Sequence, residues 1–110
     1  MTKLNLSPTA AGLLRALLAR AGVDRDRILL TDFRSIDWQS LTFIGERHEI
    51  QLRIVGPSAT AIAARMTADL AEAEFSIPGQ IVADIQLKQI TSSDGDGPVL
   101  LDIEALTIQE

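Results

Sequence analysis

The segment that decides the fold is the alternating run His48-Glu49-Ile50-Gln51-Leu52-Arg53-Ile54, which is followed by Gly56-Pro57-Ser58. Apolar side chains stand at every second position of the run, and this period predicts a β-strand with one buried and one solvated face. The glycine and proline end the strand and begin a helix. Because a helix and an extended run also come before this strand, the order helix, strand, strand occurs twice. That order predicts helices packed on an antiparallel sheet.

Two apolar stripes predict the helices. The first helix extends from Ser7 to Gly22, where the serine suits the N-cap, the adjoining proline suits the first turn, and the glycine suits the left-handed residue after the last turn. The second stripe starts after Gly56-Pro57-Ser58 and keeps helical spacing from Ala59 to Ala73. Within it, Arg65 and Asp69 are four residues apart, the spacing of a stabilising ion pair on a helix.

Four extended segments complete the pattern. The first begins at Ile28 and runs to a hairpin turn expected at Gly45-Glu46. A one-residue bulge near Gln39-Ser40 would bring four large apolar residues to one face. These residues are Ile36, Trp38, Leu41 and Phe43. A type II turn at Ile77-Pro78-Gly79-Gln80 precedes the third strand, predicted at 81–87. A loop at 92–98 precedes the last strand, which is predicted to begin at Val99 and run almost to the terminus.

The topology depends on Leu4 and Leu6, which also alternate. If they form a strand, the order is βαββαβ plus a C-terminal strand, a ferredoxin-like sandwich, and this is the version we favour. If they only staple the entry to the first helix, the order is αββαββ. Both versions are a single α+β domain over 1–110, a two-layer sandwich with two helices on one face of an antiparallel sheet. Such a fold implies no particular activity.

Composition excludes several classes of site. The 110 residues contain no cysteine, so disulfides, thiolate metal sites and cysteine nucleophiles are ruled out. A net charge of −5 argues against nucleic acid as a partner. No run of about 18 apolar residues predicts a membrane span, and we expect a cytoplasmic bacterial protein without a membrane partner.

The charge is unevenly distributed along the chain. Residues 1–54 hold eight cationic and six acidic side chains, whereas residues 55–110 hold two and nine. Such asymmetry can orient one subunit against another. A solvated surface with chance segregation is the simpler interpretation.

His48 is the first candidate site residue, because it is the only histidine and titrates near neutral pH. Strand parity places it on the face of Ile50 and Leu52, at the rim beside the expected turn, and directs Glu49 to the opposite face. A general base at this position would lack an orienting carboxylate. We therefore expect a half-buried rim histidine, with a cost of no more than about 1 kcal/mol for His48→Gln.

Trp38 and Arg34 are the other candidates. Trp38 shares the parity of Ile36 and is expected in the core, with its indole N–H at an edge acceptor. Arg34 belongs to a group of arginines that would bind an anion if the fold gathered them, although their irregular spacing favours a solvated surface. The other members of the group are Arg15, Arg20, Arg25 and Arg27.

Two acidic groups are further candidates, one as a calcium loop and the other as a pair of carboxylates. Asp94-Gly95-Asp96-Gly97 resembles part of a calcium loop, but it lacks the glutamate at the twelfth position and the flanking helices. Asp69 and Glu72 are three residues apart on the second predicted helix, on its solvated side. We therefore predict no metal, no cofactor and no catalytic residue.

The favoured function is a non-enzymatic association module, a homodimer joined through sheet faces or edges. Since helices cover only one face, the other is free to contact a second copy or another protein. The residues expected on it are Thr42, Ile44, Val55, Val82, Leu100, Leu106 and Ile108. Two alternatives remain open. One is a small ligand-binding enzyme with a pocket near His48 or the arginines, and the other is a structural subunit of a larger assembly, of the phage-tail or secretion type.

Overall fold

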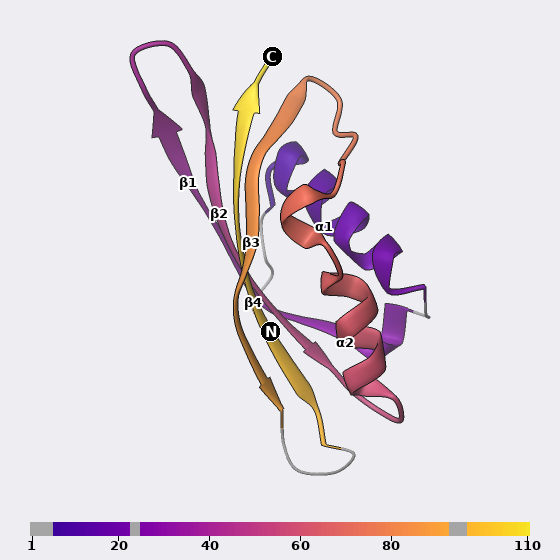
Figure 1. Ribbon diagram of the computed structural model, residues 1–110. Helices are drawn as coiled ribbons and strands as arrows, with labels where there is room; N and C mark the ends of the chain where they lie inside the picture. The colour runs from indigo at the N-terminus through magenta and orange to yellow at the C-terminus, as the bar shows by residue number, and fades with distance from the viewer. Residues whose placement is uncertain (1–5, 23–24, 93–96) are drawn as a thin grey trace.

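A computed structural model describes residues 6–22, 25–92 and 97–110. Within these ranges the element order is helix, strand, strand, helix, strand, strand, with two short 3-10 turns between them (Figure 1). The elements are α1 (Pro8–Ala21), η1 (Arg25–Arg27), β1 (Ile28–Gln39), β2 (Ile44–Ile54), α2 (Ala59–Thr67), η2 (Leu70–Glu72), β3 (Gln80–Ser92) and β4 (Val99–Gln109).

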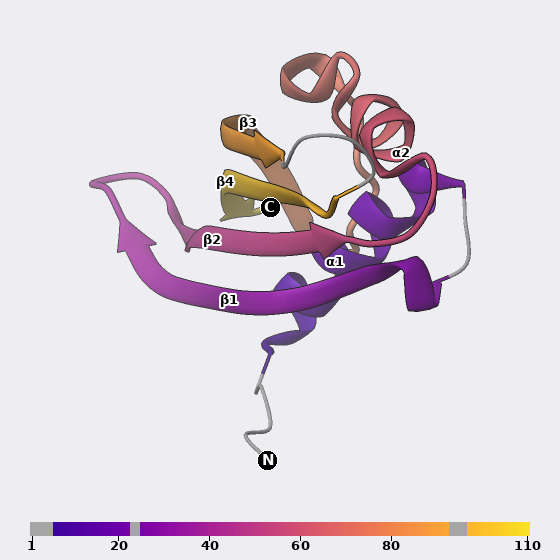
Figure 2. The same ribbon diagram turned by 90° about the horizontal axis from the view of Figure 1, so that it is seen from below.

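The four strands form one antiparallel sheet in the order β1-β2-β4-β3, so β2 and β4 are central and β1 and β3 are the edges. Both helices lie on one side of it (Figure 1, Figure 2). This confirms a two-layer α+β arrangement. We call the uncovered side of the sheet the open face. The described order is αββαββ; residues 1–5, which would supply most of a strand at Leu4 and Leu6, lie outside the described ranges.

The predicted ends of α1 are confirmed. Ser7 is the N-cap, and its hydroxyl accepts a hydrogen bond from the Ala10 amide at 3.1 Å. Gly22 adopts φ 66°, a left-handed conformation in which a side chain would be strained. Leu13, Leu17 and Ala21 on the predicted stripe are fully buried against the sheet and α2.

The predicted second helix is too long. α2 ends at Thr67, because Ala68 is extended and Asp69 takes a left-handed φ of 50° before the short turn η2. Asp69 is therefore not on the helix, and neither the Arg65–Asp69 ion pair nor the Asp69–Glu72 carboxylate pair forms on one helical face. The apolar stripe remains buried across the break, at Met66 and Leu70, because the 3-10 turn continues the same packing surface.

The predicted β1–β2 turn is also wrong. The turn lies at Ser40–Phe43, where the Ser40 amide donates to the Phe43 carbonyl at 2.9 Å, and Gly45 pairs with Trp38 inside the sheet. A Cβ at Gly45 would overlap the carbonyl oxygen of Thr107 on β4. Glycine is therefore required here because β2 and β4 approach each other closely, and not because the chain turns.

β3 is longer than expected, β4 runs to Gln109 in agreement with the prediction, and the bulge of β1 lies elsewhere. The register of β1 against β2 shifts at Thr31, not near Gln39, and β3 shifts at Ala83 and Lys88. β3 and β4 continue to Ser92 and Gln109. The type II turn before β3 is confirmed, since Gln80 donates to the Ile77 carbonyl at 3.0 Å and Gly79 has φ 74°.

Candidate functional site

His48 lies in the buried layer between α1 and the sheet. It shares its face with Ile50 and Leu52, as predicted, but it is fully buried rather than at the rim. Its Nδ1 is 2.8 Å from the Ser35 hydroxyl on β1, and its Nε2 is 2.9 Å from the Thr107 hydroxyl on β4. The Phe33 ring meets the imidazole edge-on, with centroids 5.9 Å apart. The rim expectation was wrong because β1 and β2 extend well beyond this position.

The neighbouring hydrogen bonds indicate the tautomer of His48. The Thr107 hydroxyl donates to the Glu46 carbonyl oxygen at 3.4 Å, so it is available as an acceptor for Nε2–H. Nδ1 then accepts from the Ser35 hydroxyl. The result is a neutral imidazole with both nitrogens satisfied, which links β1, β2 and β4 through side chains.

Burial lowers the pKa of His48 from 6.5 to about 4, because the charged imidazolium would lose its hydration. The ring is therefore neutral at physiological pH. Its protonation would also leave Nδ1–H facing a serine hydroxyl that must turn from donor to acceptor. This cluster stabilises the neutral form.

The Ser35 hydroxyl and His48 are 2.8 Å apart, which is also the distance between an activated nucleophile and its base in an enzyme. The pair can therefore be compared with a catalytic serine and histidine. In such a pair a carboxylate usually orients the imidazole and stabilises its protonated form. Here the second nitrogen faces Thr107, and the low pKa makes His48 a weak base. The described surface hollows are lined by other residues. This geometry favours a structural role for His48.

The arginines do not form one anion site. Arg20 donates to the Met66 carbonyl at 2.9 Å and also to the Ala68 carbonyl, at the end of α2. Arg65 of α2 in turn donates to the Ala21 carbonyl of α1 at 2.9 Å. The two helix C-termini are thus capped by each other's arginines, which satisfies free carbonyls and complements both helix dipoles.

The remaining arginines of that group are also dispersed. Arg27 donates to the Val55 carbonyl at 2.8 Å and to the Pro57 carbonyl, and so holds the connection from β2 to α2. Arg25 begins η1. Arg34 is on the open face of the sheet, 3.9 Å from the Glu49 carboxylate, with both side chains largely exposed. Such a pair contributes little to stability. The contacts of Arg20, Arg27 and Arg34 are with protein groups at three separate places.

Charged side chains occupy the middle of the open face. Cross-strand registers align Arg34 with Glu49 and then Glu104, and Arg47 binds Glu104 at 2.6 Å. A shallow hollow of about 250 Å³ lies over these strands, and its lining includes Asp32, Lys88 and Asp102 with some of the same charges. Charges of both signs alternate there, so this area has no single-sign potential for one ion.

One end of the open face is apolar. Trp38, Gly45, Ile108 and Ile81 are aligned in one row across β1, β2, β4 and β3. In the next row Ile36 and Leu106 alternate with Arg47 and Asp84. We call Ile36, Trp38, Ile81, Leu106 and Ile108 the apolar end. Trp38 is half-buried there, so the prediction of a core tryptophan was wrong. Trp38 and Ile36 do share one face of β1, as predicted, but this is the open face of the sheet and not the helix-covered face.

Part of the predicted open face is confirmed. Leu100, Leu106 and Ile108 lie on it, whereas Ile44 and Val82 have the parity of the helix-covered side. Thr42 is in the hairpin turn, and Val55 follows the end of β2. The prediction for Ile44 is wrong because the hairpin turn lies before this residue, at Ser40–Phe43, and not after it, at Gly45-Glu46.

Ser35 and Thr107 are the residues that sequence reasoning missed. They lie 13 and 59 positions from His48, so only the sheet brings them to the imidazole. The parity of the last strand is a usable signal for Thr107, since it follows Leu101, Ile103 and Ala105 at every second position. A lone threonine on a buried face calls for a buried polar partner.

No group of three or more metal-ligating side chains gathers within the described ranges. The Asp94–Asp96 part of the loop lies outside them, so the calcium question there stays a prediction. None of the described helices is long and apolar enough to cross a membrane.

The fold has a counterpart among solved structures. The chain is similar to one chain in the structure of the virion of a native gene transfer agent (GTA) particle, with a TM-score of 0.57 and 11% sequence identity. The match covers 93% of this chain and 98% of that chain, so the likeness in fold extends over nearly the whole of both. No protein-family model matches the sequence, and no curated protein is similar to it.

Proposed function

We propose that this protein is a structural subunit that associates with further copies of itself in a larger assembly. The observation that carries the proposal is the apolar end of the open face, where large hydrophobic side chains from three strands gather without a helix to cover them. Contiguous exposed apolar surface of this kind marks an association site in soluble proteins. The likeness in fold to a chain of a virion particle is consistent with a subunit role.

The other features of the molecule fit the same role. The polar side chains that would be catalytic candidates are used internally, His48 in a buried cluster and Arg20 and Arg27 at backbone carbonyls. Four long strands paired over most of their length form a platform that suits a surface in contact with neighbours. Homodimerisation is the smallest form of this association.

Sedimentation of the intact chain at micromolar concentrations tests the proposal. We expect species heavier than the 11.9 kDa monomer. Ile36→Arg should shift the population toward monomer, because a second cation beside Arg47 in the apolar end cannot be buried without a partner. Leu29→Arg is the matched control, since Leu29 and Ile36 are on the same face of β1 with 44% and 46% exposure, at opposite ends of the strand.

A purely monomeric protein over the whole concentration range would contradict the proposal. Equal effects of Ile36→Arg and Leu29→Arg would also contradict it, because they would show a general response to added charge. A catalytic function would be favoured instead if Ser35→Ala abolished a biological activity while the folding and association of the chain were unchanged.

A further inference from the structure

The β1–β2 hairpin carries apolar side chains on a rigid turn. The Ser40 hydroxyl accepts hydrogen bonds from the amides of Thr42 at 3.3 Å and Phe43 at 3.0 Å, in addition to the backbone bond that closes the turn. Leu41 is fully exposed at its tip, and Phe43 and Ile44 are half exposed behind it. Figure 2 shows this hairpin extending past the ends of β3 and β4. We call Leu41, Phe43 and Ile44 the hairpin knob.

A preorganised turn lowers the entropic cost of binding, because its apolar side chains are already held in place. Nothing within the described chain covers the knob. Three large hydrophobic residues held in water on a fixed turn therefore indicate a surface that is buried in a complex.

A hollow on the other layer of the molecule has the size and chemistry to receive such side chains. It lies between α1 and the turn before β3, and has a volume of about 200 Å³. Its lining is Pro8, Thr9, Gly12, Arg15, Ile77 and Pro78. An apolar cavity of about 150 Å³ accommodates benzene, so this hollow is large enough for a leucine or a phenylalanine ring.

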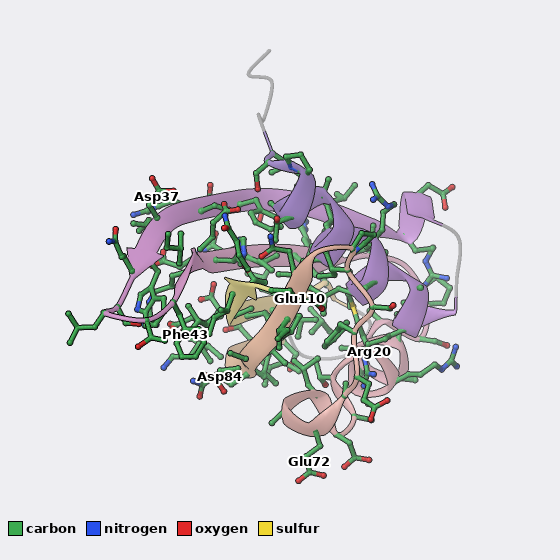
Figure 3. The ribbon with its side chains drawn as sticks, turned by 90° about the horizontal axis from the view of Figure 1, so that it is seen from above. Arg20, Asp37, Phe43, Glu72, Asp84 and Glu110 are labelled. Carbon is green, nitrogen blue, oxygen red and sulfur yellow. The ribbon has the colours of Figure 1, made fainter. Side chains whose placement is uncertain are left out.

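The charges beside the two surfaces are complementary. Asp37 is on the hairpin directly opposite Glu46, and two carboxylates in a cross-strand pair repel each other unless a cation is near. Asp37 and Phe43 both lie on the hairpin at one end of the molecule (Figure 3). Arg15 is the only charged residue of the hollow; it is exposed, and it forms no side-chain hydrogen bond or ion pair with another described residue.

A second hollow, on the open face, is a poorer receptor for the knob. It is lined by Thr31, Gln51 and Leu100 among others, and its one charged residue is Asp102. A carboxylate there would repel Asp37 and Glu46 of an incoming hairpin. Charge complementarity therefore selects the hollow beside α1.

We infer that the hairpin knob of one copy docks into the hollow beside α1 of a second copy, with Asp37 of the first facing Arg15 of the second. The inference rests on the proposed function and adds a second contact between copies, separate from the apolar end of the open face. Each copy carries both a knob and a hollow, so this contact can form between identical copies.

A charge exchange tests the pairing. Asp37→Arg and Arg15→Asp should each weaken self-association about tenfold, because each places like charges at the contact, and the double variant should return to within about threefold of the parent. The measurement is the dissociation constant from sedimentation, with circular dichroism to verify folding. If the double variant is as weak as the product of the two single effects, Asp37 and Arg15 do not meet and the inference is wrong.

The apolar part of the contact has its own test. Leu41→Ser should weaken association more than Leu29→Ser, since Leu29 lies at the far end of the sheet from the knob. Wild-type association that is unaffected by Leu41→Ser and by both charge changes would overturn the inference but leave the proposed function in place. Absence of association in the wild type would instead remove the proposed function itself.

Discussion

The two ends of the β1–β2 ribbon differ in residue type and in environment. At the end near Ile28 and Ile54, large aliphatic side chains are buried under the helices, whereas at the hairpin end Phe43 and Ile44 remain about half exposed. The helix-side positions near the hairpin are mostly polar, at Ser35, Asp37, Gln39 and Glu46. The difference in environment arises because the helices reach only part of the length of the strands.

The helices set this boundary through their lengths. α1 has 14 residues and α2 has 9, while β1 and β2 have 12 and 11 residues at more than twice the rise per residue. A strand pair of that length extends beyond any cover that these helices provide. Hydrophobic residues beyond the boundary cannot contribute to the monomer core, and they are available for a contact between molecules.

The largest expected effect is a difference in unfolding free energy between a substitution at the helix-covered end of the ribbon and one at the hairpin end. Leu52→Ala removes a fully buried side chain and should lower the free energy of unfolding by about 3 to 4 kcal/mol, through lost burial and a residual cavity. Phe43→Ala, at the hairpin tip, should change it by less than about 0.5 kcal/mol. Urea denaturation of monomeric samples measures both. Similar losses for the two variants would mean that the hairpin tip is part of the core.

The buried His48 should make stability depend on pH. Its pKa falls from 6.5 to about 4 on folding, so the unfolded chain binds the proton more tightly between these values. The associated stability is complete above pH 6.5 and decreases as pH falls toward 4, by about 3 kcal/mol in total. Unfolding free energies measured from pH 7 to pH 4 should show this slope.

His48→Gln isolates this effect from the titration of carboxylates. The variant should lose the part of the slope between pH 6.5 and 4 that belongs to the imidazole. At pH 7 it should be less stable by about 2 kcal/mol, because the buried Thr107 hydroxyl loses its partner and the hydrogen bond to Ser35 is also lost. This exceeds the cost of no more than 1 kcal/mol expected for a rim histidine. Parallel pH profiles for parent and variant would show that His48 is not the titrating group.

Gly45 lies at the hairpin end of the ribbon, opposite Trp38. Gly45→Ala should cost about 2 kcal/mol, because the new methyl group would overlap the backbone of Thr107 and force β2 and β4 apart. Gly79→Ala is a useful contrast, since its φ of 74° is strained for alanine but its Cβ would meet nothing within 4 Å. In an NMR comparison, Gly45→Ala should shift the amides of β4 near Thr107, and Gly79→Ala should leave them unchanged.

The smallest effect concerns the arginines. Arg20→Ala should cost about 1 kcal/mol, because two carbonyls at the end of α2 lose their donor. Arg34→Ala, on the open face, should cost less than about 0.5 kcal/mol, since its ion pair with Glu49 is exposed and 3.9 Å long. Thermal unfolding measures both. Equal losses would contradict the distinction between a capping arginine and a surface arginine.

Local chemistry determined a large part of this molecule. The capping serine and proline of α1, the left-handed glycine at its end, the Ile77–Gln80 turn and the alternation of β2 all depend on a few neighbouring residues, and each is confirmed. The two-layer α+β class follows from the order of these segments. The helix-covered face of β2 could therefore be assigned, including the side on which His48 lies.

Tertiary structure decided the features that depend on distant partners. The burial of His48 requires Thr107, 59 positions away, and the end of α2 is stabilised by Arg20, 46 positions before Met66. The turn at Ser40–Phe43 depends on how far β1 and β2 extend, and the half-buried position of Trp38 depends on which side of the sheet the helices cover. Alternation indicates which residues share a face of a strand. It does not indicate which of the two faces the helices will cover, or how much of the strand's length they will cover. That is set by packing between segments far apart in the chain.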